Sequence, residues 1–248
     1  MKSKIILKEG NEIWMYLEDT PYYVANSIRR SILEYVKTFA IEDVYIKKNT
    51  SAMWDEVLAL RLGLIVLKAD EGVEQATFEL KAKGPKWVYA EELKIKDIKG
   101  KGKVEIVYPK TILTYLDENQ EIELEAVAIW GCGKEHAKWV PAHVFYKYMP
   151  KLTQTVEKLD KKLEDLCPRK LYKIENGRLK IIDEKTFLIN CDICKACEDY
   201  SGGKIKMEED ENNIIFYIES FGQYSPEEVF NKGIEELKDK LSELKEKL

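Results

Sequence analysis

The sequence predicts an α+β protein with more than one compact unit, and three observations support this. The chain has 248 residues, which is longer than a typical single domain. Its middle part alternates apolar and polar residues as strands do, whereas helical spacing occurs near both ends. A group of cysteines in the last third predicts an additional small unit held by a metal group.

Composition excludes several classes of protein. Hydrophobic residues make up 45% and charged residues 34%, as in globular rather than disordered or fibrous chains. The net charge of −5 argues against a general nucleic-acid binder. No apolar run approaches the roughly 20 residues that span a bilayer. The first residues leave no room for the apolar part of a signal peptide, so we expect a cytoplasmic protein.

The beginning of the chain predicts a β-hairpin and a helix. Residues 4–8 and 12–17 alternate around a turn at residues 9–11. Thr20 is then expected to cap a helix that has Pro21 at its first position. The apolar residues that follow at helical spacing are Val24, Ile28, Ile32, Tyr35, Val36 and Phe39.

The middle of the chain predicts a β-rich region. Its expected elements are a strand at 40–47, a short helix at 51–62, and strands at 64–67, 76–82, 103–108 and 121–130. Five lysines lie close together between the later strands: Lys94, Lys96, Lys99, Lys101 and Lys103. They could contact phosphates, but we interpret them as the solvated edge of a sheet, where lysine discourages association with other strands.

The last segment predicts a long helix with an interaction surface. Ser225, Pro226 and Glu228 form a capping box with proline at the first helical position. Apolar residues then recur with a period near 3.5 and would form one continuous row along the helix, which we call the seam. The seam comprises Phe230, Ile234, Leu237, Leu241, Leu244 and Leu248. It could pack only on the sheet of its own chain. We favour a second polypeptide on this face, because little sequence remains to cover it.

The cysteines give the clearest chemical signal. Cys191, Cys194 and Cys197 form a C-x2-C-x2-C motif, and Cys167 is followed by proline. In bacterial-type ferredoxins such a triplet and a remote Cys-Pro belong to iron–sulfur ligation. A hairpin expected at 170–182, with its turn at 175–177, could bring Cys167 back to the triplet. These four residues are therefore the predicted ligands of one iron–sulfur cluster, either [4Fe–4S] or [3Fe–4S].

Other interpretations of the cysteines remain open. Structural zinc also uses four thiolates, although usually as two separated pairs. Disulfides would require an oxidising compartment or a hyperthermophilic source. Cys132 stands apart and is expected to be a free thiol; a site with His136 and His143 would lack a fourth ligand.

Catalytic motifs are missing from the sequence. It has no D-x-D-x-D triplet, no phosphate-binding P-loop and no G-x-S-x-G motif. Without clustered carboxylates to hold metal ions, the chain is not expected to polymerise nucleotides by itself.

Several segments resemble the alpha-subunit family of RNA polymerases, in particular its archaeal D subunits. The matching segments are 26–33, 39–44, 49–51, 55–59, 61–65, 133–139 with Pro141, and 216–222. The resemblance implies a discontinuous dimerisation domain at 1–40 and 213–248. It also implies a β-rich insert domain at 41–154 and a ferredoxin-like α+β insert at 155–212 that carries the cysteines.

The resemblance also implies a non-catalytic assembly function in transcription. A heterodimer with the small L subunit would form through Val24, Ile28 and the C-terminal seam. Arg29 and Arg30 would contact the large catalytic subunits, and the small subunits N and P would be further partners. Nucleic acid would be reached only through the complex. Two alternatives from other classes are a ferredoxin-like electron-transfer protein and a zinc-stapled binding module.

Overall fold

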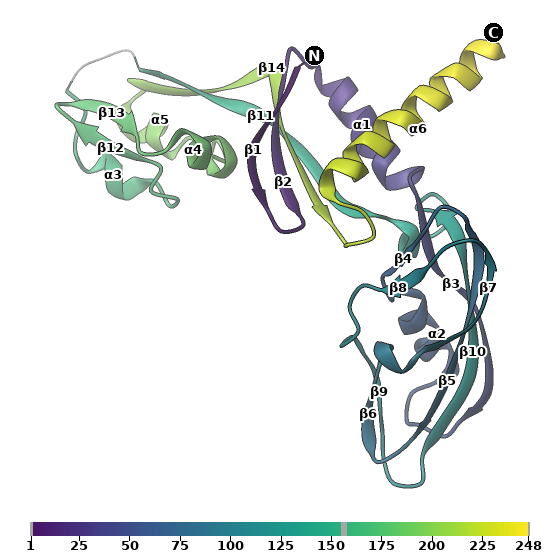
Figure 1. Ribbon diagram of the computed structural model, residues 1–248. Helices are drawn as coiled ribbons and strands as arrows, with labels where there is room; N and C mark the ends of the chain where they lie inside the picture. The colour runs from purple at the N-terminus through teal and green to yellow at the C-terminus, as the bar shows by residue number, and fades with distance from the viewer. Residues whose placement is uncertain (1, 155–157, 248) are drawn as a thin grey trace. The chain divides into compact units, whose positions relative to one another are not determined.

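The computed structural model describes residues 2–154 and 158–247 and confirms the α+β class (Figure 1). The chain divides into two compact units. The first comprises Met1–Arg29 and Val144–Ile218, and the second comprises Arg30–His143 and Glu219–Leu248. Both units are therefore built from segments distant in sequence.

The first unit contains a four-stranded sheet of order β1-β2-β14-β11. Its strands are β1 (Lys2–Glu9), β2 (Glu12–Glu18), β11 (Ala142–Gln154) and β14 (Ile205–Ser220). The predicted N-terminal hairpin is confirmed, with Glu9 opposite Glu12 and a left-handed Gly10 in the turn. Alternation along β2 buries Ile13 and Leu17 completely.

The first helix is shorter than its apolar spacing predicts. α1 covers Tyr22–Glu34, and β3 (Lys37–Asn49) begins soon after it. Phe39 is therefore a buried strand residue that pairs with Trp130, because cross-strand packing determines the structure here. The expected cap is also wrong: the Thr20 hydroxyl donates to the Glu18 carbonyl.

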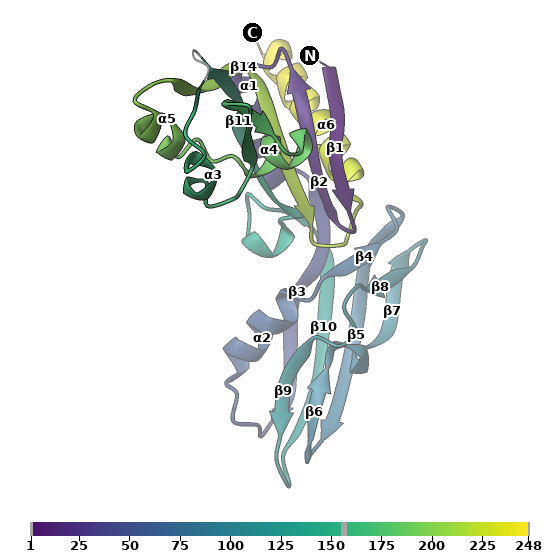
Figure 2. The ribbon, with the colours of Figure 1, turned by 90° about the vertical axis from the view of Figure 1, so that its left-hand side faces the viewer.

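The second unit contains a six-stranded sheet of order β7-β5-β10-β3-β4-β8, seen at the lower part of Figure 2. Its further strands are β4 (Leu67–Ala69), β5 (Val73–Lys83), β7 (Lys94–Gly100), β8 (Val104–Ile106) and β10 (Glu121–Cys132). The expected strand at 64–67 contributes only its last residue. A separate pair is formed by β6 (Lys86–Tyr89) and β9 (Ile112–Leu116).

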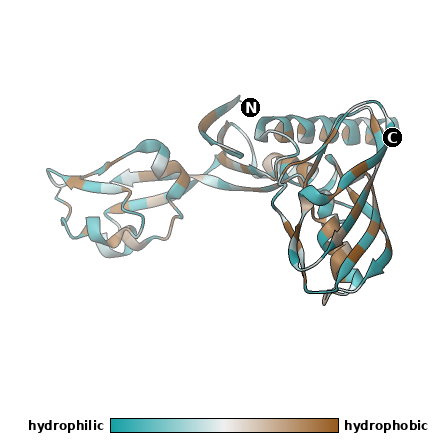
Figure 3. Cartoon of the chain, turned by 60° about the horizontal axis from the view of Figure 1, so that its bottom comes forward, coloured by the Kyte–Doolittle hydropathy of each residue, from teal (hydrophilic) through white to brown (hydrophobic). Residues whose placement is uncertain are grey.

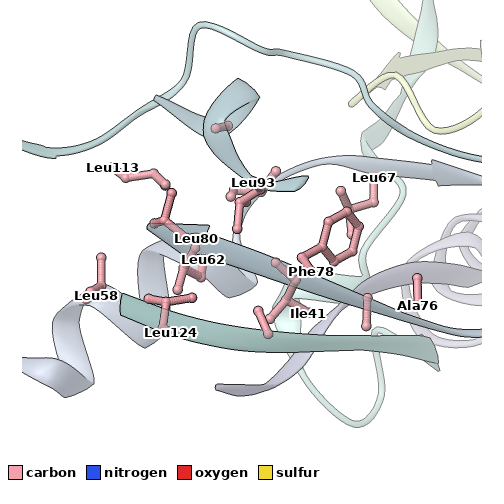
Figure 4. Close-up of a cluster of buried hydrophobic side chains, with 14 of the residues drawn as sticks. Ile41, Leu58, Leu62, Leu67, Ala76, Phe78, Leu80, Leu93, Leu113 and Leu124 are labelled. Atoms are coloured by element: carbon pink, nitrogen blue, oxygen red, sulfur yellow. The ribbon is translucent and has the colours of Figure 1, made fainter. Parts of the chain in front are cut away.

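The core of this unit lies between the sheet and α2 (Asp55–Gly63) (Figure 4). Phe78, Leu80, Leu62 and Leu124 are completely buried in it. The helix begins after the expected residue 51. The Ser51 N–H and hydroxyl both donate to the Asn49 side chain, and such local bonds favour a turn over a helix.

The lysine-rich segment forms the edge of the sheet, as predicted. β7 is the terminal strand and is mostly exposed. Lys96 pairs with Glu125 of β10 at 2.9 Å, and Lys99 donates to Gln75 at 3.0 Å. These lysines therefore have partners within the protein.

The C-terminal helix α6 covers Pro226–Glu246, and its predicted capping box is confirmed. The Ser225 N–H donates to the Glu228 carboxylate at 2.7 Å, and the Glu228 N–H donates to the Ser225 hydroxyl. A Cβ atom at Gly233 would lie 2.3 Å from the side chain of Ile32, so glycine allows α6 to approach α1 closely. Hydrophobic and hydrophilic residues alternate along this helix (Figure 3). No helix in the described residues is long and apolar enough to cross a membrane.

The cysteine-bearing segment lies between β11 and β14 in the chain. Its elements are α3 (Leu163–Leu166), β12 (Tyr172–Glu175), β13 (Arg178–Ile181), α4 (Glu184–Asn190) and α5 (Ala196–Ser201). The predicted hairpin is confirmed, because Glu175 pairs with Arg178. Asn176 and Gly177 both have positive φ, as a tight turn of this length requires.

Two short single-turn helices complete the described fold, Ala90–Glu92 and Ala137–Trp139. The second brings Trp139 against Gly131, where an added Cβ atom would lie 2.4 Å from the indole ring. Cys132, next to this glycine, is the last residue of β10.

Candidate functional site: a pocket of four cysteines

The structure brings the four predicted ligands together. Cys167, Cys191, Cys194 and Cys197 all line one small cavity of about 50 Å³. Cys167 follows α3, Cys191 follows α4, Cys197 lies in the first turn of α5, and Cys194 lies in the loop before it. None of the cysteines in the described part of the chain forms a disulfide. Two segments separated in sequence, one with Cys167 and one with the triplet, therefore supply thiols to one site.

The loop that carries the triplet has a strained backbone. Ile193 has φ +49° and Lys195 has φ +60°, so the residues on both sides of Cys194 are left-handed. A β-branched residue rarely adopts this conformation, and strain of this kind is concentrated at ligand-binding sites. Burial differs along the loop: Cys191 and Cys197 are buried, whereas Cys194 is exposed.

Backbone N–H groups point at the sulfur atoms. The Leu171 N–H donates to Cys167 Sγ at 3.5 Å. Burial raises the pKa of the Cys191 thiol, and a hydrogen bond from the Ile193 N–H partly opposes this. Burial likewise raises the pKa of Cys197, against hydrogen bonds from its own N–H and that of Glu198. These donors are suited to sulfur that carries negative charge.

Tyr172 is a site residue that the sequence did not reveal. It lines the same cavity and is only 4% exposed, yet its hydroxyl has no hydrogen-bond partner among the described residues. The pKa of this hydroxyl is raised, first by burial and then by the four cysteines. The only signal in the sequence is its position in the strand after Cys167, which does not distinguish it from a core tyrosine.

Lys147 connects the cysteine loop to the sheet of the first unit. Its ammonium donates to the carbonyls of Ile189 at 2.7 Å and Cys191 at 2.9 Å. Burial lowers its pKa. Lys147 lies in β11, far from the cysteines in sequence, and no motif predicts its role.

The donor set fits a group held by soft sulfur ligands. Four thiols, N–H donors and a buried hydroxyl with no partner within residues 2–154 and 158–247 surround one cavity. Thiolates suit iron–sulfur clusters and zinc. Among the described residues, no three His, Cys, Asp or Glu side chains converge to hold a single metal ion. In a cluster the thiolates bind different irons, so convergence on a single atom is not required.

The predicted interface residues lie on α1 and α6. Ile28 and Phe230 are buried, whereas Val24, Ile234 and Leu237 are half-buried. The seam then becomes solvent-accessible, with Leu241 58% and Leu244 55% exposed. Leu248 lies outside the described residues.

The two arginines of α1 have different partners, as their expected angular separation requires. Arg29 donates to the Asn26 side chain at 3.0 and 3.2 Å. Arg30 is exposed and pairs with Glu34 at 2.9 Å.

The chain is similar to known transcription proteins over almost its whole length. Residues 30–143 match the RNA polymerase Rpb3/RpoA insert domain family, and the same residues form the first segment of the second unit. DNA-directed RNA polymerase subunit Rpo3 of Methanopyrus kandleri is 36% identical over 94% of this chain and 90% of its own length.

Two further relatives carry the same name. The Rpo3 subunit of Methanobrevibacter smithii is 35% identical over 97% of this chain and 95% of its own length. The Rpo3 subunit of Thermococcus kodakarensis is 31% identical over 91% of this chain and 89% of its own length. The chain therefore belongs to the family of archaeal RNA polymerase subunit Rpo3 and is a non-catalytic component of the polymerase rather than an enzyme by itself.

Proposed function

We propose that this chain is the assembly platform of a cytoplasmic archaeal RNA polymerase. It forms a heterodimer with a small L-type subunit, and the heterodimer recruits the large catalytic subunits and the small subunits N and P. The exposed part of the seam on α6 is the observation that carries this proposal, together with membership of the Rpo3 family.

The seam runs from a covered to an uncovered region. Phe230 is 7% exposed, whereas Leu241 and Leu244 are more than half exposed on the same side of the helix. Covering such a leucine stabilises a complex by roughly 1.5–3 kcal/mol before entropic costs. A helix from a second polypeptide, packed along α6, would cover this row.

Substitution of the seam tests the heterodimer. The double variant Leu241→Lys/Leu244→Lys should fail to co-purify with a co-expressed L-type subunit, because two charges would be buried at the contact. Glu243→Lys/Glu246→Lys is the matched control, because these residues lie on the other side of α6. A tight one-to-one complex of the leucine variant in size-exclusion chromatography would show that the seam is not the interface.

Recruitment of a large subunit is assigned to the arginines of α1. Arg30 is exposed, and its surface pair with Glu34 is exchangeable for a carboxylate of a partner. The variant Arg29→Ala/Arg30→Ala should retain the small heterodimer and bind the large subunits more weakly in a pull-down. Loss of the heterodimer with normal large-subunit binding would reverse this assignment.

We further propose that the four cysteines bind one iron–sulfur cluster, [4Fe–4S] or [3Fe–4S], with a structural role. The shared cavity, the N–H groups directed at sulfur and the sequence spacing support this proposal. The bound cluster would cross-link the Cys167 segment and the triplet loop in a part of the chain that has a small apolar core.

Metal and sulfide quantification of anaerobically purified protein tests the cluster. We expect about four irons per chain for [4Fe–4S], with acid-labile sulfide and broad absorbance near ~400 nm. Tightly bound zinc without iron would instead support a zinc-stapled module. Rapid reversible reduction coupled to turnover of a partner would support electron transfer.

A further inference from the structure

We propose that Tyr172 is a positioning residue of the cysteine site and that its hydroxyl donates a hydrogen bond to a sulfur atom of the bound group. The inference rests on the iron–sulfur cluster proposed above and adds a specific role for a residue outside the ligand set. The observation behind it is a buried hydroxyl that has no hydrogen-bond partner in the described part of the chain and lies at the wall of a cavity lined by four thiols.

The position of Tyr172 is fixed by the surrounding fold. Its backbone pairs with Ile181 in the β12–β13 hairpin, and its ring packs in the small core that also contains Phe187. The Leu171 N–H before it already donates to Cys167 Sγ. The segment that follows Cys167 therefore carries two donors at the same site, one on the main chain and one on a side chain.

Other acceptors around the cavity do not satisfy this hydroxyl. Asp192 also lines the cavity but is exposed and lies 3.4 Å from the Arg169 guanidinium. The carbonyls of Ile189 and Cys191 accept from Lys147. A hydroxyl left without an acceptor in such surroundings costs free energy, so an acceptor is expected in the bound state. The four cysteine sulfurs that line the cavity would be negatively charged acceptors when the group is bound.

The hydroxyl can act as a hydrogen-bond donor at this site, because a tyrosine O–H carries its proton at neutral pH. Hydrogen bonds to the sulfurs of a cluster are among the factors that set its reduction potential. Because reduction adds negative charge to the cluster, a donor stabilises the reduced form more than the oxidised form. Removing the hydroxyl should lower the potential.

The test compares Tyr172→Phe with wild-type full-length protein under anaerobic conditions. The ring and its packing are retained, and only the hydroxyl is lost. We expect the midpoint potential, from dithionite titration followed by electron paramagnetic resonance, to shift to a lower value. We also expect faster loss of iron to a chelator, and loss of one D2O-exchangeable proton coupling in electron–nuclear double resonance. Tyr200→Phe is the matched control, since its hydroxyl contacts Asp160 and does not line the cavity.

The outcomes separate this inference from the cluster proposal. A wild-type protein without iron would overturn both. An iron-loaded protein whose potential, iron loss and proton coupling are the same in Tyr172→Phe as in Tyr200→Phe would overturn only the role of Tyr172. Failure of Tyr172→Phe alone to retain iron, with Tyr200→Phe fully loaded, would support the inference, because a single hydroxyl would then be required to hold the cluster.

Discussion

The second unit and the cysteine-bearing segment are stabilised in different ways. The described core of the second unit is made of aliphatic side chains, phenylalanines and alanines on a six-stranded sheet and α2. The core of the cysteine-bearing segment is much smaller and includes Cys191, Cys197 and Tyr172 among its buried residues. A small unit of this kind buries too little apolar surface to be stable without a cross-link. The first region therefore depends on packing, whereas the cluster proposed above would supply the cross-link of the second.

Removal of a ligand should have the largest effect. Cys194→Ser should lose the cluster and leave the segment at 158–207 open to protease, because structural metal binding contributes on the order of 10 kcal/mol to folding in small units. Limited proteolysis with mass spectrometry measures this, and Cys132→Ser in the second unit is the control. A variant that loses iron but resists protease like wild type would remove the structural role and favour electron transfer.

Truncation of the apolar core should destabilise the second unit and leave the cysteine-bearing segment unaffected. Phe78 is completely buried in the second unit, so Phe78→Ala should cost about 3–5 kcal/mol of unfolding free energy there. The iron content should stay unchanged. Hydrogen exchange, followed separately for residues 30–143 and 158–207, measures the stability of each region. Iron loss in this variant would show that the two regions are not independent.

Loss of the Lys147 contact should destabilise the cysteine loop by an intermediate amount. Lys147→Met removes the two hydrogen bonds to the cysteine loop and should destabilise that loop by about 1.5–3 kcal/mol. Faster hydrogen exchange around residues 189–197 is the expected signal, and exposed Lys151→Met of the same strand is the control. Equal hydrogen-exchange rates in the two variants would show that the Lys147 hydrogen bonds do not hold the loop in place and would leave that role to the cluster alone.

The smallest effect is a pH dependence of the stability of the second unit that comes from one tyrosine. The Tyr224 hydroxyl donates to the Lys37 carbonyl, and burial, with Glu71 and Glu228, raises its pKa from 10.0 to about 12. The folded state therefore holds this proton more tightly. The resulting stabilisation is fully present below pH 10.0 and is lost as the pH rises through about 12.

Tyr224→Phe should remove this alkaline dependence, on the order of 1 kcal/mol. Denaturant unfolding between pH 9 and 11 measures the difference in slope. Wild type and variant with parallel pH profiles would show that this tyrosine has the same pKa in the folded and unfolded states.

The sequence predicted local features well where a single local interaction decides them. The capping box at Ser225, the turn at Asn176 and Gly177, and the lysine edge all appear as expected. Helix ends were less predictable. Phe39 fits a helical spacing, but its pairing with Trp130 across the sheet places it in a strand.

The sequence identified the four cysteines that share the cavity, but not the residues around them. The cysteine spacing predicts that these thiols lie together, whereas the positions of Tyr172 and Lys147 at the site depend on contacts between segments distant in sequence. Lys147 lies 44 positions from Cys191, whose carbonyl it contacts. No local pattern encodes such a contact, so only the three-dimensional structure reveals it.

The place of the cysteine-bearing segment in the sheet has a further consequence. β11 and β14 are neighbours in the sheet, and the Thr153 hydroxyl near the end of β11 contacts the Lys206 carbonyl near the start of β14. The whole segment thus occupies the position of a hairpin turn. A loop at such a position can lengthen, shorten or disappear while both strands keep their partners. The cysteine-bearing segment is, in architectural terms, a detachable module, which could be gained or lost in evolution without a change in the sheet that carries it.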